Sequence, residues 1–184
     1  MELLLALAVA ATLMGLAIPL TSSALDEMRT AMAARYVAGR IMAARVDALQ
    51  RSASVALRFE PSSGDYTMAV YVDGNRNGVR TSEIASGIDT QLSPQERLGD
   101  RFADVRFGLA AGIPDLDGAM QFDDRDGVRV GTPAILTMSP DGTATSGSVY
   151  IRGRRGQYAI RVLGATARTR VFQYHIGASG WVVR

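Results

Sequence analysis

One short stretch, DGNRNGVRTSE, holds the residues with the clearest potential for chemistry. Asp73, Asn75 and Asn77 alternate before a glycine, and Glu83 follows six residues after Asn77. Side-chain oxygens at alternate positions before a glycine are typical of the first half of a calcium-binding loop. The twelfth position, where such a loop places a carboxylate, holds Ile84, and Asn-Gly is a turn signal in its own right. The pattern leaves calcium open as a cofactor and favours a plain turn.

A second group of candidate residues is basic. All 20 basic residues are arginine, against 18 acidic residues, which gives a formal net charge of +2. Contacts to nucleic-acid phosphates need only a basic patch, and arginines gather near the C-terminus. The candidates for such contacts are Arg152, Arg154, Arg155, Arg168, Arg170 and Arg184. The small net charge favours a solvated turn and strand edge, and leaves DNA open as a partner.

No residue pattern typical of catalysis occurs in the sequence. His175 is the only histidine, lysine and cysteine are absent, and no serine lies in a Gly-x-Ser-x-Gly setting. The lack of cysteine excludes a disulfide framework, a thiolate metal site and a cysteine nucleophile. We therefore expect a protein that is not an enzyme, without catalytic residues or a confident metal site, in which His175 is structural.

The N-terminal residues predict a long helix. The eighteen residues from Leu3 to Leu20 contain Thr12 as the only polar side chain. A helix of this length rises about 27 Å, close to the thickness of the hydrocarbon core of a bilayer. Glu2 precedes the apolar run, and Pro19 lies near its end. We expect a membrane-spanning half that bends or loosens near Pro19.

The helical pattern continues without a proline as far as residue 60. Apolar residues recur at steps of three and four, which predicts one face of a helix packed on the domain that follows. The predicted stripe comprises Leu25, Met28, Met32, Tyr36, Gly39, Met42, Val46, Leu49, Ala53 and Ala56. We expect three parts: a transmembrane helix at 1–20, an amphipathic helical spine at 21–59 and a β-rich head domain at 60–184.

The head domain has the pattern of short strands and turns. ASVALRF and YTMAVYV flank EPSSGD as a hairpin, and QYAIRVLG and RTRVFQYHI flank ATA in the same way. AILTMS and GSVYIRG flank PDGTATS, and GWVVR predicts a last strand, whereas 82–104 is poorly patterned and DDRDG at 123–127 predicts a solvated turn. The predicted fold class is α+β, with a long N-terminal helix, half membrane and half amphipathic, packed on a C-terminal antiparallel sheet.

Both ends of the chain resemble a known family. ELLLALAVAATLMGLAIP resembles the N-terminal segment of type IV pilins and pseudopilins, which share a glutamate near the start of the mature helix and a proline seventeen residues later; Glu2 and Pro19 have this spacing. PAILTMSPDGTATSGSVYI and YAIRVLGATARTRVFQY are similar to the C-terminal domain of the GspH/FimT class of minor pseudopilins, although Ala167 stands where glycine is common. The family's basic leader is lacking, which a start codon placed too far downstream or a truncated chain would explain.

The resemblance implies a structural role. It implies a minor pseudopilin, a subunit of an envelope filament of a type II secretion system or a type IV pilus. Glu2 would meet the N-terminal amine of a neighbouring subunit and set the register, and Pro19 would make the anchor flexible. The implied partners are other pilin-like subunits, an inner-membrane assembly platform and, before assembly, membrane lipid. The implied location is the bacterial inner membrane, crossed once, with the head domain in the periplasm.

Two other functions stay open. A DNA-binding minor pilin used in DNA uptake would employ the arginines near the C-terminus. A secreted globular domain, either a binding module or an enzyme, would lose a signal peptide and start near Leu25, since SSA ending at Ala24 fits a cleavage site.

Overall fold

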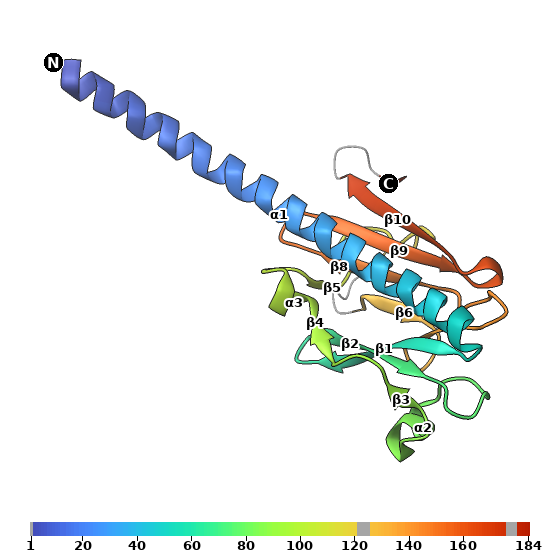
Figure 1. Ribbon diagram of the computed structural model, residues 1–184. Coiled ribbons are helices and arrows are strands. Elements are labelled where there is room, and N and C mark those ends of the chain that lie inside the picture. The colour runs from blue at the N-terminus through green and yellow to red at the C-terminus, as the bar shows by residue number, and fades with distance from the viewer. Residues whose placement is uncertain (1, 121–125, 176–179) are drawn as a thin grey trace.

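The protein consists of one long helix followed by two antiparallel sheets (Figure 1). The computed structural model describes residues 2–120, 126–175 and 180–184, with the side chains at 4–6, 8–11 and 13–22 left aside. Helix α1 (Glu2–Arg51) is helical at every residue, so the chain does not unwind at Pro19, where we expected it to loosen. Figure 1 shows the N-terminal half of α1 standing clear of the sheets and its C-terminal half lying across them.

The first sheet has the strand order β3-β2-β1-β7, and β4 also pairs with β2. Its strands are β1 (Val55–Ser62), β2 (Asp65–Val72), β3 (Thr90–Gln91), β4 (Glu96–Arg97) and β7 (Ile135–Met138). The predicted hairpin of β1 and β2 is confirmed, and its two-residue loop holds Ser63 and Gly64 at positive φ. This is the backbone that a tight hairpin turn requires.

The second sheet has the order β11-β10-β9-β8-β5, and β6 also pairs with β8. Its strands are β5 (Arg106–Phe107), β6 (Val128–Val130), β8 (Gly147–Arg152), β9 (Gln157–Leu163), β10 (Arg168–His175) and β11 (Gly180–Val183). The predicted hairpin of β9 and β10, joined by η1 (Gly164–Thr166), and the last strand β11 are confirmed. The PDGTATS stretch instead connects the two sheets, because β7 and β8 belong to different ones.

The segment that we expected to be irregular contains short elements. Helices α2 (Thr81–Ser86) and α3 (Leu98–Arg101) lie there together with β3 and β4. Of the acidic DDRDG stretch, residues 123–125 lie outside the described part of the chain.

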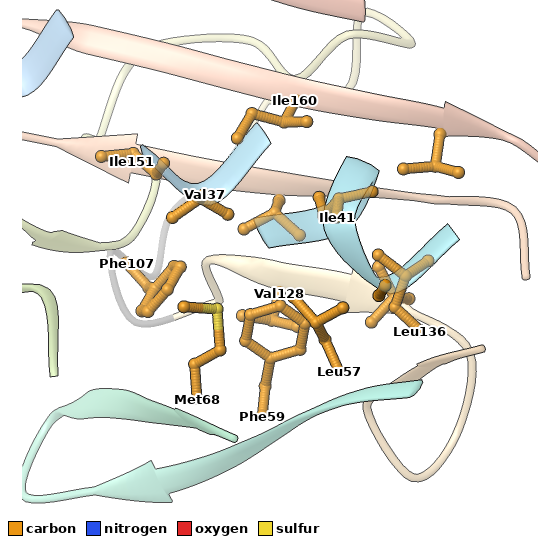
Figure 2. Packing of buried hydrophobic residues seen from close by; sticks show 14 of the residues in the cluster. Val37, Ile41, Leu57, Phe59, Met68, Phe107, Val128, Leu136, Ile151 and Ile160 are labelled. Atoms are coloured by element: carbon orange, nitrogen blue, oxygen red, sulfur yellow. The ribbon is translucent and has the colours of Figure 1, made fainter. Parts of the chain in front are cut away.

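The main core lies where α1 meets both sheets. Val37 and Ile41 of α1 lie over Ile151 and Ile160 of the second sheet (Figure 2). On the side of the first sheet, the ring of Phe59 packs edge-on against Phe107 of β5, with ring centroids 5.5 Å apart. The largest fully buried apolar side chains in this core include Ile41, Leu57, Phe59, Met68, Leu98, Phe107, Leu136, Met138, Ile151 and Ile160. One helix face therefore joins the two sheets into a single body.

The prediction of a membrane-spanning half is wrong. Among the described residues, no helix is long and apolar enough to cross a membrane. From Ser23 onward, where the side chains of α1 are described without a gap, charged residues such as Asp26, Glu27 and Arg29 recur along the helix. The predicted fold class is corrected to one long helix, without a membrane half, and two antiparallel sheets. The single-pass location in the bacterial inner membrane, with a periplasmic head, is corrected with it.

The face of α1 that packs on the sheets is also not the predicted one. Met42, Val46 and Leu49 of the predicted stripe stay 44–50% exposed. The buried face consists mostly of small residues, and its members are Asp26, Thr30, Ala33, Ala34, Val37, Ile41, Ala44 and Ala48. Small side chains let a helix axis approach its neighbours closely, so alanine is favoured where α1 crosses the sheets. The larger apolar residues are left on the opposite side.

Candidate functional site

The outward face of α1 carries a regular apolar stripe. Positions 25, 28, 32, 35, 39, 42, 46 and 49 follow one another at alternating steps of three and four. This outward stripe consists of Leu25, Met28, Met32, Arg35, Gly39, Met42, Val46 and Leu49, all of them exposed. Six of the eight are large apolar residues, each between 44% and 60% exposed. The spacing is that of the a and d positions of a coiled coil, where two helices pack along a seam.

The same spacing continues toward the N-terminus. Counting back from Leu25 by the same steps reaches Thr21, Ile18, Met14, Ala11, Leu7 and Leu4. Of these, Leu7 has a described side chain, and it is 70% exposed. The half of α1 that protrudes from the sheets and the half that lies on them therefore share one heptad register.

A buried carboxylate fastens α1 to the second sheet. Asp26, 6% exposed, accepts hydrogen bonds from the backbone N–H groups of the turn between β8 and β9. Oδ1 accepts from Arg154 at 2.9 Å, and Oδ2 accepts from Arg155 at 2.8 Å and from Gly156 at 3.2 Å. Burial by itself would raise the pKa of Asp26, but these three donors outweigh it and hold the pKa below its ordinary value. We call Asp26 and this turn the helix latch.

Two glycines allow the helix latch to close. Gly153 donates its N–H to the carbonyl of Gly156 at 2.9 Å and so closes the turn. A Cβ on Gly156 would lie 2.8 Å from Oγ1 of Thr30, and one on Gly153 would lie 2.8 Å from Oδ1 of Asp26. The Thr30 hydroxyl is itself held by the carbonyl of Asp26 at 2.7 Å. Only glycine fits so close to the helix.

Further polar contacts hold the helix after the latch, toward its C-terminal end. Glu27 accepts a hydrogen bond from Nε2 of Gln173 on β10 at 2.7 Å. Further along, the hydroxyl of Tyr36 donates to the carboxylate of Glu96 on β4, at 2.7 and 2.8 Å to its two oxygens. Arg40 forms an ion pair with the same carboxylate. These contacts fix the rotation of α1 about its own axis, and the outward stripe therefore faces away from both sheets.

The structure places the two predicted assembly residues in α1, before the helix latch. Glu2 is the first residue of α1 and is exposed. Pro19 lies within the same unbroken helix, and its side chain lies outside the described part of the chain. Both residues belong to the half of α1 that protrudes in Figure 1.

The predicted calcium ligands come together, but as a hydrogen-bonded turn. The carboxylate of Asp73 accepts the backbone N–H groups of Asn75, Arg76 and Gly78 at 2.6–3.1 Å. The side-chain amides of Asn75 and Asn77 both donate to Oε1 of Glu83. Within the described residues, no group of three or more acidic, histidine or cysteine side chains is placed to hold a metal ion.

We expect calcium to leave this turn unchanged and the Asp73 carboxylate to be essential for it. Asp73→Ala should lower the free energy of unfolding by about 2 kcal/mol, because three backbone N–H groups lose a buried acceptor. Millimolar Ca²⁺ should not change the melting temperature of the wild-type chain, since Asp73 and Glu83 already bind donors of the loop. Thermal unfolding with Ca²⁺ or with a chelator measures both effects. A higher melting temperature with Ca²⁺ would contradict the turn interpretation.

The six arginines proposed for nucleic acid do not form one surface. Arg154 and Arg155 lie in the helix latch before β9, whereas Arg168 pairs with Leu163 at the other end of β9. The length of this strand, about 20 Å, separates the two groups. Arg154 is also paired with Asp104, at 3.1 Å.

The remaining predicted arginines lie on strands of the second sheet. Arg152 ends β8 and Arg170 lies on β10. Arg184 contacts Gln173 at 2.7 Å and His175, the only histidine of the sequence, at 3.0 Å.

Known proteins give no assignment for this chain. Comparisons with protein-family models, with curated proteins and with solved structures find no match. The role of α1 is therefore inferred from its two faces. The sheets bury one face and leave the other exposed.

Proposed function

We propose that this chain is a structural subunit of the pseudopilin kind, which assembles by packing α1 against the α1 helices of neighbouring copies. The observation that carries the proposal is the outward stripe. Large apolar side chains at strict heptad spacing are costly to expose along a whole helix face. A neighbouring helix that packed on this face would remove them from water.

The protruding half of α1 supports the same proposal. A helix that stands clear of its own domain gains no stability from tertiary packing, which is the usual source of helix stability in proteins. Its residues continue the register of the outward stripe. Packing between helices of neighbouring subunits would supply the missing contacts along the full length of α1.

Glu2 has a role in this arrangement that depends on assembly. At the first turn of α1, its carboxylate lies near the positive end of the helix dipole. In a bundle of helices, a carboxylate is tolerated where a positive group of a neighbour meets it. Glu2 would then fix how far one helix is shifted along the next.

The proposal is tested with the full chain and a matched pair of variants. Met28→Glu and Met42→Glu place charge on the outward stripe, while Ile88→Glu places it on the head at an equal exposure of 46% to that of Met42. We expect the wild-type chain to associate with concentration in sedimentation equilibrium. Each stripe variant should weaken association by about tenfold or more, since a buried methionine is worth 1.5–3 kcal/mol. Ile88→Glu should behave like the wild type.

Two results would contradict the proposal. One is a wild-type chain that stays monomeric over the whole concentration series. The other is association that the stripe variants leave unchanged, because the outward stripe would then take no part in the contact between copies.

A further inference from the structure

The second sheet has an arginine row on the face that points away from α1. Backbone pairing aligns Arg129 on β6 with Ser148 on β8, Ser148 with Arg161 on β9, and Arg161 with Arg170 on β10. Directly paired residues of neighbouring strands project from the same face, and each strand adds about 4.8 Å. The backbone positions of the three arginines therefore lie in a line across one face of the sheet, with Ser148 between the first two. None of the row takes part in the contacts of α1.

A pocket of about 340 Å³ opens between the first two arginines of the row. Its polar lining consists of Asp117, Arg129, Ser146, Ser148, Tyr150 and Arg161. Residues 109–116 cover the neighbouring part of this face, where Trp181 donates its indole N–H to the carbonyl of Pro114 at 2.9 Å. Asp117, which follows this segment, lines the pocket.

Arg161 already binds a carboxylate in this pocket. Its Nη2 donates to Oδ2 of Asp117 at 2.6 Å, and its Nε donates to the hydroxyl of Ser148 at 3.1 Å. The side chain of Asp117 is 69% exposed. An ion pair so open to water contributes little to stability, so another carboxylate can exchange with Asp117 at small cost.

Of the other two arginines, Arg170 has donors to offer such a ligand, whereas Arg129 lines the pocket with its donors engaged or buried. Arg129 is fixed by Asp115 and by Asp126, and its Nη2 is buried without an acceptor among the described residues. The guanidinium carbon of Arg129 lies 5.5 Å from the centre of the Tyr150 ring, which packs against it. Arg170 is exposed, and within the described part of the chain no acid pairs with it.

We propose that this pocket binds the carboxylate groups of an acidic polypeptide segment, which displaces Asp117 from Arg161, lies beside Arg129 and reaches Arg170. The local charge argues against nucleic acid as the ligand. Three acids, Asp115, Asp117 and Asp126, accompany the three arginines of the row, so the surface lacks the strong positive field that attracts polyphosphate. The pocket has room for a few side chains of the ligand, and one of their carboxylates takes the place of Asp117 on Arg161.

The test uses the full chain and a fluorescein-labelled hexaglutamate peptide, with hexaglutamine as the neutral control. Fluorescence anisotropy should show binding of hexaglutamate that weakens with salt. Arg161→Gln should weaken it by about tenfold, as expected for the loss of a charge-assisted pair. Arg58→Gln is the matched control, because Arg58 is also paired with an acid, Glu60, on the other sheet.

Asp117→Asn is the decisive variant. It removes the carboxylate that competes with the peptide for Arg161 and should tighten hexaglutamate binding several-fold. If Asp117 had a merely structural role, the affinity would not increase. Its side chain is exposed, so folding is not at risk if Arg161→Gln proves unstable. Equal binding of the two peptides, an unchanged affinity in Asp117→Asn, or tighter binding of a single-stranded oligonucleotide with the same dependence on Arg161 would each overturn the proposal.

Discussion

Replacing Asp26 with alanine is expected to lower the free energy of unfolding by about 3 kcal/mol, because three backbone N–H groups of the β8–β9 turn lose their shared acceptor. The turn is closed against α1 so tightly that neither glycine in it tolerates a Cβ. Urea denaturation of the full chain measures the loss. Asp47→Ala on the same helix is the matched control, since no described residue pairs with Asp47, and it should change stability by less than about 0.5 kcal/mol.

The charge of Asp26 makes the stability of the fold depend on pH, and the direction of this dependence follows from its pKa. Its pKa is lower in the folded chain than in the unfolded chain, so the folded state binds fewer protons in this range. The stability that Asp26 supplies is therefore fully present above its unfolded pKa of about 3.9 and is lost as the pH falls through the lower folded pKa. The difference in stability between wild type and Asp26→Asn should be constant above about pH 5 and shrink below pH 4. The reverse trend would mean that the carboxylate is not stabilised by the turn.

Other carboxylates titrate in the same range but cancel in this comparison. Burial raises the pKa of Asp65, which gives the opposite sign. For Asp115, burial works against the backbone donors and the Arg129 pair, which outweigh it and lower the pKa. Both residues are unchanged in Asp26→Asn, so the difference curve isolates Asp26.

Phe59→Ala should have the largest effect on stability, a loss of about 4 kcal/mol. Phe59 is 1% exposed, and its ring lies between the two sheets, edge-on to Phe107. Removing the ring leaves a cavity in the core that α1 and both sheets share. Because that core is common to all three layers, we expect a single cooperative transition with a lower midpoint in urea denaturation monitored by tryptophan fluorescence and by circular dichroism.

Phe172→Ala is the control for Phe59→Ala. Phe172 is only partly buried and packs in a separate cluster on the outer face of the second sheet. Its truncation should cost less than that of Phe59. Two separate transitions in Phe59→Ala would contradict a shared core, since the sheets would then unfold independently.

The local pattern of the sequence predicted the strands well. Two hairpins and the last strand follow from alternating apolar residues flanked by turn residues, and the structure has them. Such signals are contained within a few neighbouring residues. The assignment of β7 and β8 to different sheets is not, because it depends on the pairing of β7 with β1, far away in the sequence.

The helix shows where the same reasoning fails. A search for large apolar residues at helical spacing finds Met42, Val46 and Leu49 and assigns them to the core. The alanines that pack in their place, such as Ala44 and Ala48, have the same spacing but contribute little to a hydrophobicity pattern. The helix therefore carries two stripes, one of small residues for the sheets and one of large apolar residues for a second partner. Both stripes are present in the sequence.

The helix latch and the arginine row could not be read from the sequence. Asp26 lies 128 residues before its first donor, Arg154, and acts through backbone groups that have no sequence signature. The one sign of the latch in the sequence is the pair of glycines, Gly153 and Gly156, that flank Arg154 and Arg155. The row of Arg129, Arg161 and Arg170 depends on strand register, which the sequence alone does not fix.

The most direct test of assembly through α1 is cross-linking between copies at single introduced cysteines. The chain has no cysteine of its own, so Met42→Cys labels the outward stripe alone and Ile88→Cys labels the head at the same exposure. With a long, flexible bis-maleimide, which spans a shift between neighbouring helices, the assembly account predicts covalent dimers from Met42→Cys and monomers from Ile88→Cys. Equal yields from the two variants, or no dimers from Met42→Cys, would contradict it.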